Sequence, residues 1–218
     1  MARVTDRHGR PVSGQMPGLV EAIVVDNVDP ERLGRVRVMY PTLPDEPESH
    51  WARLVMPMAG RNRGWMTIPE IGDEVMVSFM HGDVEHAIVV GSLYNGVDRP
   101  PYANEDKENN LRVFQSRSGH KVTFDDTKGA ERIELVTHNQ EIRVEWDAAN
   151  KVLSVYCGGD INIQAANHIG VTCTNFSLSA SESVEIGAGS SMVIDAGSLA
   201  GILAGSQVQV TAPDVRIN

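Results

Sequence analysis

GDINIQAA NHIGVTCT NFSLSASE SVEIGAGS SMVIDAGS LAGILAGS QVQVTAPD, residues 159–214, repeats an eight-residue pattern seven times. In each block apolar residues alternate with polar or small ones, which is typical of a β-strand, and Ala, Gly and Ser gather where a turn is needed. A single-chain β-helix needs about three strands, or roughly 20 residues, to close one coil around its own core. One block supplies only a strand of about five residues and a corner. The period therefore predicts that each chain forms one side of a three-sided coil.

The other two sides of such a coil must come from other copies of the chain. Three identical chains with closed cyclic symmetry complete it, so we predict a homotrimeric, triple-stranded β-helix needle. The alternative is a monomeric sandwich of loose Ser- and Gly-rich strands, but a sandwich gives no reason for a constant period over seven blocks. The side chains predicted to face the trimer core are Ile161, Ile163, Ile169, Val171, Phe176, Leu178, Val184, Ile186, Met192, Ile194, Val208 and Val210.

The composition favours β-structure with small residues at its corners and limits the possible partners. Of 218 residues, 41% are hydrophobic, only 5% are aromatic and 20 are glycine. The formal net charge of −10 argues against nucleic acid as a partner, because neutralising phosphates needs clustered Lys and Arg, and against electrostatic binding to anionic membranes. No segment approaches the ~18 apolar residues of a membrane span, and the N-terminus has no apolar signal-peptide core. We therefore expect synthesis in the cytoplasm without a signal peptide.

Turn signals divide the remainder of the chain into regions. Five short segments with alternating apolar residues and no convincing helix predict a small Greek-key barrel of the OB type, and a proline-rich, charged segment predicts a linker after it. The expected barrel strands are Leu19–Asp26, Gly34–Tyr40, Trp51–Met56, Glu74–Met80 and His86–Tyr94. The predicted organisation is an N-terminal arm (1–17), an OB-fold barrel (18–98), a linker (99–110) and a β-helical spike (111–218), with octads from about residue 159. The fold class is thus all-β, with an N-terminal OB-type barrel followed by a C-terminal trimeric β-helix needle.

Four stretches, taken in order, resemble one known family. VVDNVDPERLGRVRVMYP (Val24–Pro41) and WARLVMPMAGRNRGWMTIPEIGDEVMVSF (Trp51–Phe79) are followed by HGDVEHAIVVGSLYNG (His81–Gly96) and FQSRSGHKVTFDD (Phe114–Asp126). The chain is similar to the spike proteins of contractile injection machines, which include phage baseplate assembly protein V and the VgrG spike of type VI secretion. The SRSGH sequence resembles the family's junction between barrel and needle, and the resemblance assigns to that junction Arg117, Ser118, Gly119 and His120.

The resemblance implies a structural role rather than catalysis. The trimer would be the central spike of a contractile tail or injection machine, where it would plug the tube, nucleate the baseplate and pierce the target envelope mechanically. About 17 residues precede the barrel, so we expect the hub of the tube to be a separate protein, and a PAAR-type tip protein to cover the C-terminal end. The protein would then be a component of an assembled virion or an extracellular injection particle. The sequence leaves open whether the machine is a phage, a phage-derived particle, an extracellular injection system or a type VI apparatus.

The sequence predicts no catalytic residue, no metal ligand and no cofactor. Adjacent carboxylates such as Asp125 and Asp126 point to opposite faces of a strand, and the chain has no nucleophile elbow, P-loop, HExxH or CxxC motif. We interpret Cys157 and Cys173 as small buried hydrophobic residues rather than as a redox pair.

The alternative function is that of an OB-type module that binds an oligonucleotide or a glycan. OB barrels hold such ligands by stacking bases or sugars on aromatic side chains over a positive groove. Trp51, Trp65 and Tyr94 are the aromatic residues available for this purpose. The acidity of the chain favours packing roles for them instead.

Overall fold

The computed structural model describes residue 16 and residues 18–214, so the predicted N-terminal arm, apart from Met16, and residues 215–218 lie outside the described part. The chain divides into two compact units, Met1–Ile161 and Asn162–Asn218. In the described part, all regular structure is β except one turn of 3-10 helix, η1 (Met80–Gly82). Among the same residues, no helix is long and apolar enough to cross a membrane.

The first sheet is a closed barrel with OB topology. Its strand order is β2-β1-β6-β7-β3, and neighbouring strands are antiparallel except for the parallel pair β3 and β7. A bridge between Val36 and Ala52 joins β2 to β3 with N–H···O distances of 3.0 and 2.7 Å, which closes the sheet into the five-stranded barrel of the OB fold. The strands, all predicted from the sequence, are β1 (Leu19–Asp26), β2 (Arg37–Met39), β3 (Arg53–Leu54), β6 (Glu74–Phe79) and β7 (Ala87–Ser92).

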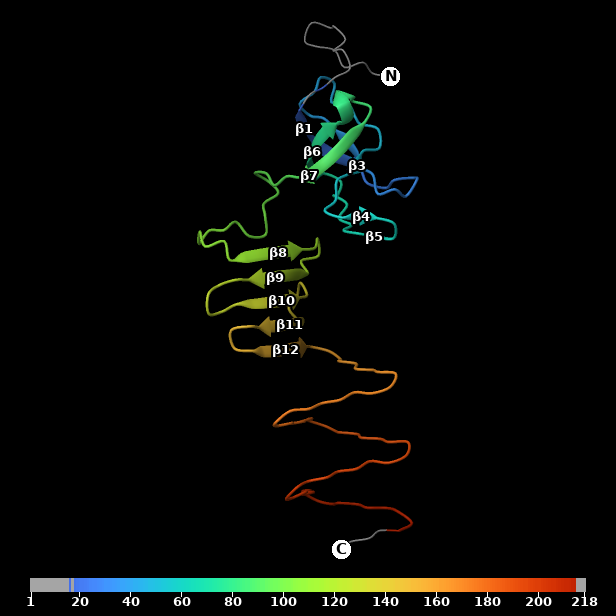
Figure 1. Cartoon of the computed structure of the whole chain (residues 1–218), viewed down its shortest axis with the longest axis vertical. Coiled ribbons are helices and arrows are strands. Elements are labelled where there is room, and N and C mark those ends of the chain that lie inside the picture. The colour runs from blue at the N-terminus through green and yellow to red at the C-terminus, as the bar shows by residue number, and fades with distance from the viewer. Residues whose placement is uncertain (1–15, 17, 215–218) are drawn as a thin grey trace. The chain divides into compact units, whose positions relative to one another are not determined.

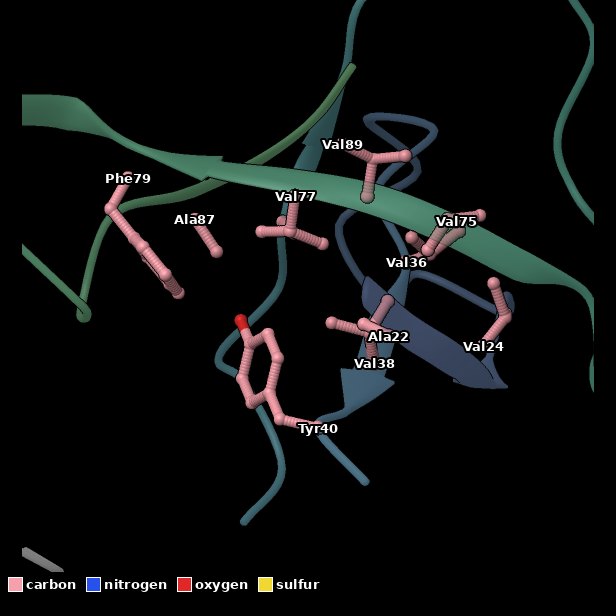
Figure 2. Close-up of a cluster of buried hydrophobic side chains, with 11 residues drawn as sticks. Ala22, Val24, Val36, Val38, Tyr40, Val75, Val77, Phe79, Ala87 and Val89 are labelled. Carbon is pink, nitrogen blue, oxygen red and sulfur yellow. The ribbon is translucent and has the colours of Figure 1, made fainter. Parts of the chain in front are cut away.

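Alternating side chains of these strands fill the barrel. Val75, Val77 and Phe79 point inward from β6, as the alternation in EVMVSFM predicts. Figure 2 shows Tyr40 and Phe79 on one side of the cluster, and their ring centroids are 5.8 Å apart. Burial raises the pKa of Tyr40 to about 12, because the phenolate would lose its hydration. The buried core consists of Ala22, Val24, Val36, Val38, Tyr40, Ala52, Val75, Val77, Phe79, Ala87 and Val89.

The connection between β3 and β6 carries a short hairpin that the sequence analysis did not predict. The Trp65 N–H donates a hydrogen bond to the Met58 carbonyl at 2.9 Å, at the base of this hairpin. Gly64 is required there, because a Cβ at this position would lie 2.8 Å from the same carbonyl oxygen. We call residues 55–69 the methionine arm, after the three methionines they contain. The two hairpin strands are β4 (Ala59–Gly60) and β5 (Arg63–Gly64).

The second sheet is an antiparallel meander in which each strand pairs with the next one along the chain (Figure 1). These strands lie in the region 111–218, which the sequence analysis assigns to the spike. Their bounds are β8 (Leu111–Gln115), β9 (Lys121–Asp125), β10 (Arg132–Val136), β11 (Ile142–Asp147) and β12 (Val152–Cys157).

The register gives this sheet one apolar and one polar side. Residues directly opposite each other in antiparallel strands point to the same side of a sheet. Paired residues thus form rows of side chains that run across the five strands. The rows on one side of the sheet are almost entirely apolar, whereas the rows on the other side carry carboxylates and basic groups. The apolar face, as we call it, consists of Phe114, Val122, Phe124, Ile133, Leu135, Ile142, Val144, Trp146, Leu153, Val155 and Cys157. Its larger side chains remain 39–61% exposed, so the single chain does not cover this face.

The octads form extended passes with regular bends, which Figure 1 shows as the orange and red trace. Bends fall at residues 158–159, 166–167, 174, 181–182, 189–190, 197–198, 205–206 and 213. The eight-residue step is interrupted once, because Ile169 and Phe176 are seven positions apart. Within residues 158–214, the single chain forms no strand, and the side chains predicted to face the trimer core are 51–77% exposed. The inward orientation of these side chains therefore stays a prediction.

Candidate assembly site

The predicted junction sequence forms the tight turn between β8 and β9. Gly119 has a φ of +89°, which favours glycine, and its N–H donates to the Ser116 carbonyl at 2.9 Å. The Ser116 hydroxyl in turn accepts a hydrogen bond from the His120 N–H at 3.1 Å, with Ser118 between them in the turn. A Cβ at Gly119 would lie 3.2 Å from that of His138, so this turn lies directly against the turn between β10 and β11.

Two side chains of this turn contact other elements. Arg117 forms an ion pair of 3.0 Å with Glu70, which precedes β6 of the barrel. Both partners are about half exposed or more, so the pair contributes little stability by itself. The His120 ring lies edge-on to the His138 ring with centroids 5.4 Å apart, and its Nδ1 accepts a hydrogen bond from the His138 N–H at 3.4 Å. The turn therefore contacts both the barrel and the next hairpin, while its role as the barrel–needle junction stays a prediction.

The methionine arm meets the edge of the apolar face. The Trp65 indole packs edge-on against Phe114 of β8, with ring centroids 6.4 Å apart. Met58 and Met66, which line one cavity together with Trp65, are 53% and 71% exposed. Contiguous exposed apolar surface of this kind marks an interaction site. The arm thus extends the uncovered apolar surface from the sheet to the barrel.

A buried carboxylate organises the loop DPERLGR beside this arm. Asp29 accepts hydrogen bonds from the backbone N–H groups of Glu31 and Leu33, both at 3.0 Å. Its two oxygens also bind the Arg35 guanidinium, at 2.8 and 2.9 Å. The Arg35 guanidinium, together with these backbone donors, holds the pKa of Asp29 well below its usual range. The loop places Leu33, which is 64% exposed, beside the arm.

The aromatic residues considered for ligand binding do not form one platform. Trp51 lines a cavity of about 430 Å³ together with Arg35 and His86. Trp65 lines a different cavity, of about 520 Å³, beside the methionine arm. Tyr94 is 68% exposed and lines neither. Over residues 16 and 18–214, no three His, Cys, Asp or Glu side chains lie close enough together to hold a metal ion.

Sequence reasoning missed the two surfaces that the structure makes most conspicuous. The apolar face was not recognised as one surface, although the alternation in EIRVEWD and KVLSVYC was already visible as the signal. The methionine arm entered the sequence analysis only through Trp65, considered as an aromatic residue available for ligand binding. Its apolar and basic residues were the available signal, since an exposed loop in an acidic protein has no other reason to carry them.

Comparison with known proteins identifies the barrel and its continuation. A family model described as the type VI secretion system/phage-baseplate injector OB domain matches residues 20–94. The chain is 31% identical over 159 residues to the type VI secretion system spike protein VgrG3 of Vibrio cholerae, which covers 67% of this chain and 15% of that protein. It is 32% identical over 154 residues to the spike protein VgrG1b of Pseudomonas aeruginosa, covering 65% and 21%. It is also 28% identical over 166 residues to the actin cross-linking toxin VgrG1 of Vibrio cholerae, covering 65% and 15%.

The matches agree with the closed barrel. The family model begins within β1 and ends just after β7, so it spans the strands that form the OB topology. The chain spans between 15 and 21% of the length of these three curated relatives. The resemblance seen in the sequence is confirmed: residues 20–94 match the injector OB domain, and about two thirds of the chain is similar to VgrG spike proteins.

Proposed function

We propose that three copies of this chain assemble into the central spike of a contractile tail or injection machine. The observation that carries the proposal is the amount of ordered apolar surface that one chain leaves uncovered: the apolar face of the meander and the apolar series of the octads. The large side chains of the apolar face are about half exposed, and covering the remainder contributes about 1 kcal/mol for each of them. Two further copies are the partners that the eight-residue period requires.

The assembled octads would form the needle. Each chain would supply one side of every coil, with its apolar residues on the axis and its Gly- and Ser-rich bends at the corners. Seven layers at ~4.8 Å spacing give a needle of roughly 35 Å, stiffened along its axis by the hydrogen bonds between successive strands. Stiffness along one axis is the property that a piercing device needs.

The remaining parts of the proposal concern partners and location. A hub protein of the tail tube would bind the barrel end, a PAAR-type tip protein would cover the needle end, and the target membrane would be pierced rather than bound. The complex would be part of a virion or an extracellular injection particle. We assign no catalytic activity to this chain: two of the relatives above are named as spike proteins, and the toxin name belongs to a relative of which this chain covers 15%.

Light scattering of the purified chain tests the proposal directly. We expect a mass of about 71 kDa, three times the 23.7 kDa chain, that persists in SDS until the sample is boiled. A mass of one chain at micromolar concentration would contradict the proposal. An SDS-sensitive trimer would contradict the intertwined needle but leave trimerisation through the apolar face intact.

A further inference from the structure

The barrel carries an open groove beside the methionine arm. This methionine groove has a volume of about 520 Å³ and combines apolar walls with guanidinium groups. Methionine side chains adapt to irregular apolar surfaces, and arginine pairs with carboxylates in fixed geometry. The residues that give the groove this character are Arg53, Met56, Met58, Arg63, Trp65 and Met66.

The charge around the groove is opposite to that of the whole chain. Between Glu48 and Glu70 the sequence has no Asp or Glu but has three arginines, in a protein with a formal net charge of −10. An isolated basic segment in an acidic protein marks the surface where an acidic partner binds. The groove therefore fits an extended segment that is both acidic and partly apolar.

The arginines of the groove have no carboxylate partner within the described part of the chain. Arg53 places its Nη2 3.1 Å from the Met80 sulfur, and no ion pair joins it to an acidic group there. The Arg63 guanidinium lies over Gly60, about 3.1 Å from the position that a Cβ would occupy. Both cations are thus available to an incoming segment.

The linker, residues 99–110, has the complementary chemistry. Its sequence RPPYANEDKENN begins with Arg99, two prolines and a tyrosine, and then carries three carboxylates and one lysine within residues 105–108. Within its own chain the linker is bonded to itself: the Tyr102 hydroxyl donates to Asp106 at 2.8 Å, and the Asn109 N–H donates to the Asn104 side chain at 2.6 Å. In the described part, none of its carboxylates pairs with an arginine of the groove.

We propose that the methionine groove of one copy receives the linker of a neighbouring copy, an inference that rests on the proposed trimer. The arm contacts Phe114 of β8, and the linker leads directly into β8 at Leu111, so both lie at the level of this strand. Cyclic symmetry keeps equivalent segments of neighbouring copies at the same level along the axis. The Pro-Pro-Tyr part of the linker packs on the methionines, and its carboxylates pair with Arg53 and Arg63. This exchange ties the three barrels together.

Disulfide trapping in the full-length chain tests the inference. In a Cys157→Ser, Cys173→Ser background whose mass has been checked, Met66→Cys is combined with Tyr102→Cys and the trimer is oxidised. Disulfides form only where the two Cα atoms approach to within about 7 Å. We expect covalent species of two and three chains on non-reducing SDS gels of boiled samples, because boiling separates chains that are not covalently linked. The matched control replaces Tyr102→Cys by Lys128→Cys, an exposed residue in the turn between β9 and β10, and we expect it to remain uncrosslinked.

The outcomes separate this inference from the proposed function. Disulfides between chains that form with the Met66→Cys, Tyr102→Cys pair and not with the control pair support the exchange. A disulfide within one chain, or no disulfide, in an intact trimer overturns the exchange and leaves the spike proposal standing. A wild-type chain that is not trimeric overturns both.

A charge exchange gives a second readout that does not depend on new cysteines. We expect Arg63→Glu to lower the temperature at which the trimer dissociates, and Glu105→Arg in the same chain to restore part of the loss. Arg143→Glu, on the polar side of the sheet, serves as the control for the change in net charge. If Arg63→Glu and Arg143→Glu lower the dissociation temperature equally, and Glu105→Arg restores none of the loss caused by Arg63→Glu, the inference is overturned.

Discussion

Replacing Ile194 by aspartate is the sharpest test of the needle, because the adjacent residue provides its own control. Ile194 is 73% exposed in the single chain and is predicted to point at the trimer axis. Burying a whole isoleucine side chain contributes about 1.5–3 kcal/mol, so covering the exposed part of this one contributes about 1–2 kcal/mol per chain. An aspartate there loses this contribution and adds an unpaired charge at a dry site, which costs several kcal/mol per ion. Three copies at one level bring the total to about 10 kcal/mol or more, roughly a 10⁷-fold shift in the assembly equilibrium.

Val193→Asp makes the same chemical change one position earlier, where the alternation of a strand points the side chain outward. Val193 is 84% exposed in the single chain. We expect Val193→Asp to remain an SDS-resistant trimer and Ile194→Asp to lose SDS resistance, as measured by light scattering and by unboiled SDS gels at pH 7. A resistant Ile194→Asp trimer, or equal damage by both substitutions, would refute the assignment of inward and outward positions.

Four further predictions concern the apolar face, the barrel and the octads. Leu135→Lys on the apolar face should prevent trimerisation, whereas Glu134→Lys on the polar side should leave the mass measured by light scattering unchanged. Burial raises the pKa of Tyr40 to about 12, so this tyrosine ionises at lower pH in the unfolded chain than in the folded one. The free energy of unfolding of the barrel should therefore fall between pH 10 and pH 12, by up to about 2–3 kcal/mol. Tyr40→Phe should remove this part of the decline, as measured by urea titrations. The lowered pKa of Asp29 stabilises its ionised form, so stability is present above the ordinary Asp pKa and is lost as pH falls below about 4; Asp29→Asn should lower the urea midpoint at pH 7 and flatten its dependence on pH between 5 and 3. In the Ile194→Asp variant, hydrogen exchange should show protected amides in the barrel and unprotected amides throughout the octads, and protected octads would contradict the need for three chains.

The barrel was predictable because its signals are local. Val75, Val77 and Phe79 alternate within six residues, which predicted a strand here, and the structure shows that this side of it is buried. Turn residues between five such segments predicted the OB topology, and the bridge from Val36 to Ala52 confirms it. The bends at nearly constant intervals between residues 158 and 206 likewise reflect a period that the sequence displays directly.

The arm and the groove were not predictable by the same means. The strands β4 and β5 have two residues each, so no alternation can reveal them. The groove brings together Leu33, Arg53 and Trp65, which lie on three separate segments, and their proximity follows only from the closure of the barrel. The apolar face required the register of five strands, because a shift of one strand by one residue would have moved all of that strand's side chains to the opposite side of the sheet.

The two units differ in what they need in order to fold, and this difference bears on how the spike assembles. The barrel buries eleven core residues within one chain, so it can form before any partner is met. The octads bury none of their predicted core residues in the single chain, so in the proposed trimer the entropy of ordering them would be offset by contacts among the three chains. Once barrels and meanders associate, the three octad segments are held at high effective concentration, and each layer that closes brings the next strands together. Assembly should therefore proceed from the barrels toward the C-terminus. The single seven-residue step between Ile169 and Phe176 does not interrupt it, because symmetry places the same shortened corner in all three chains at one level.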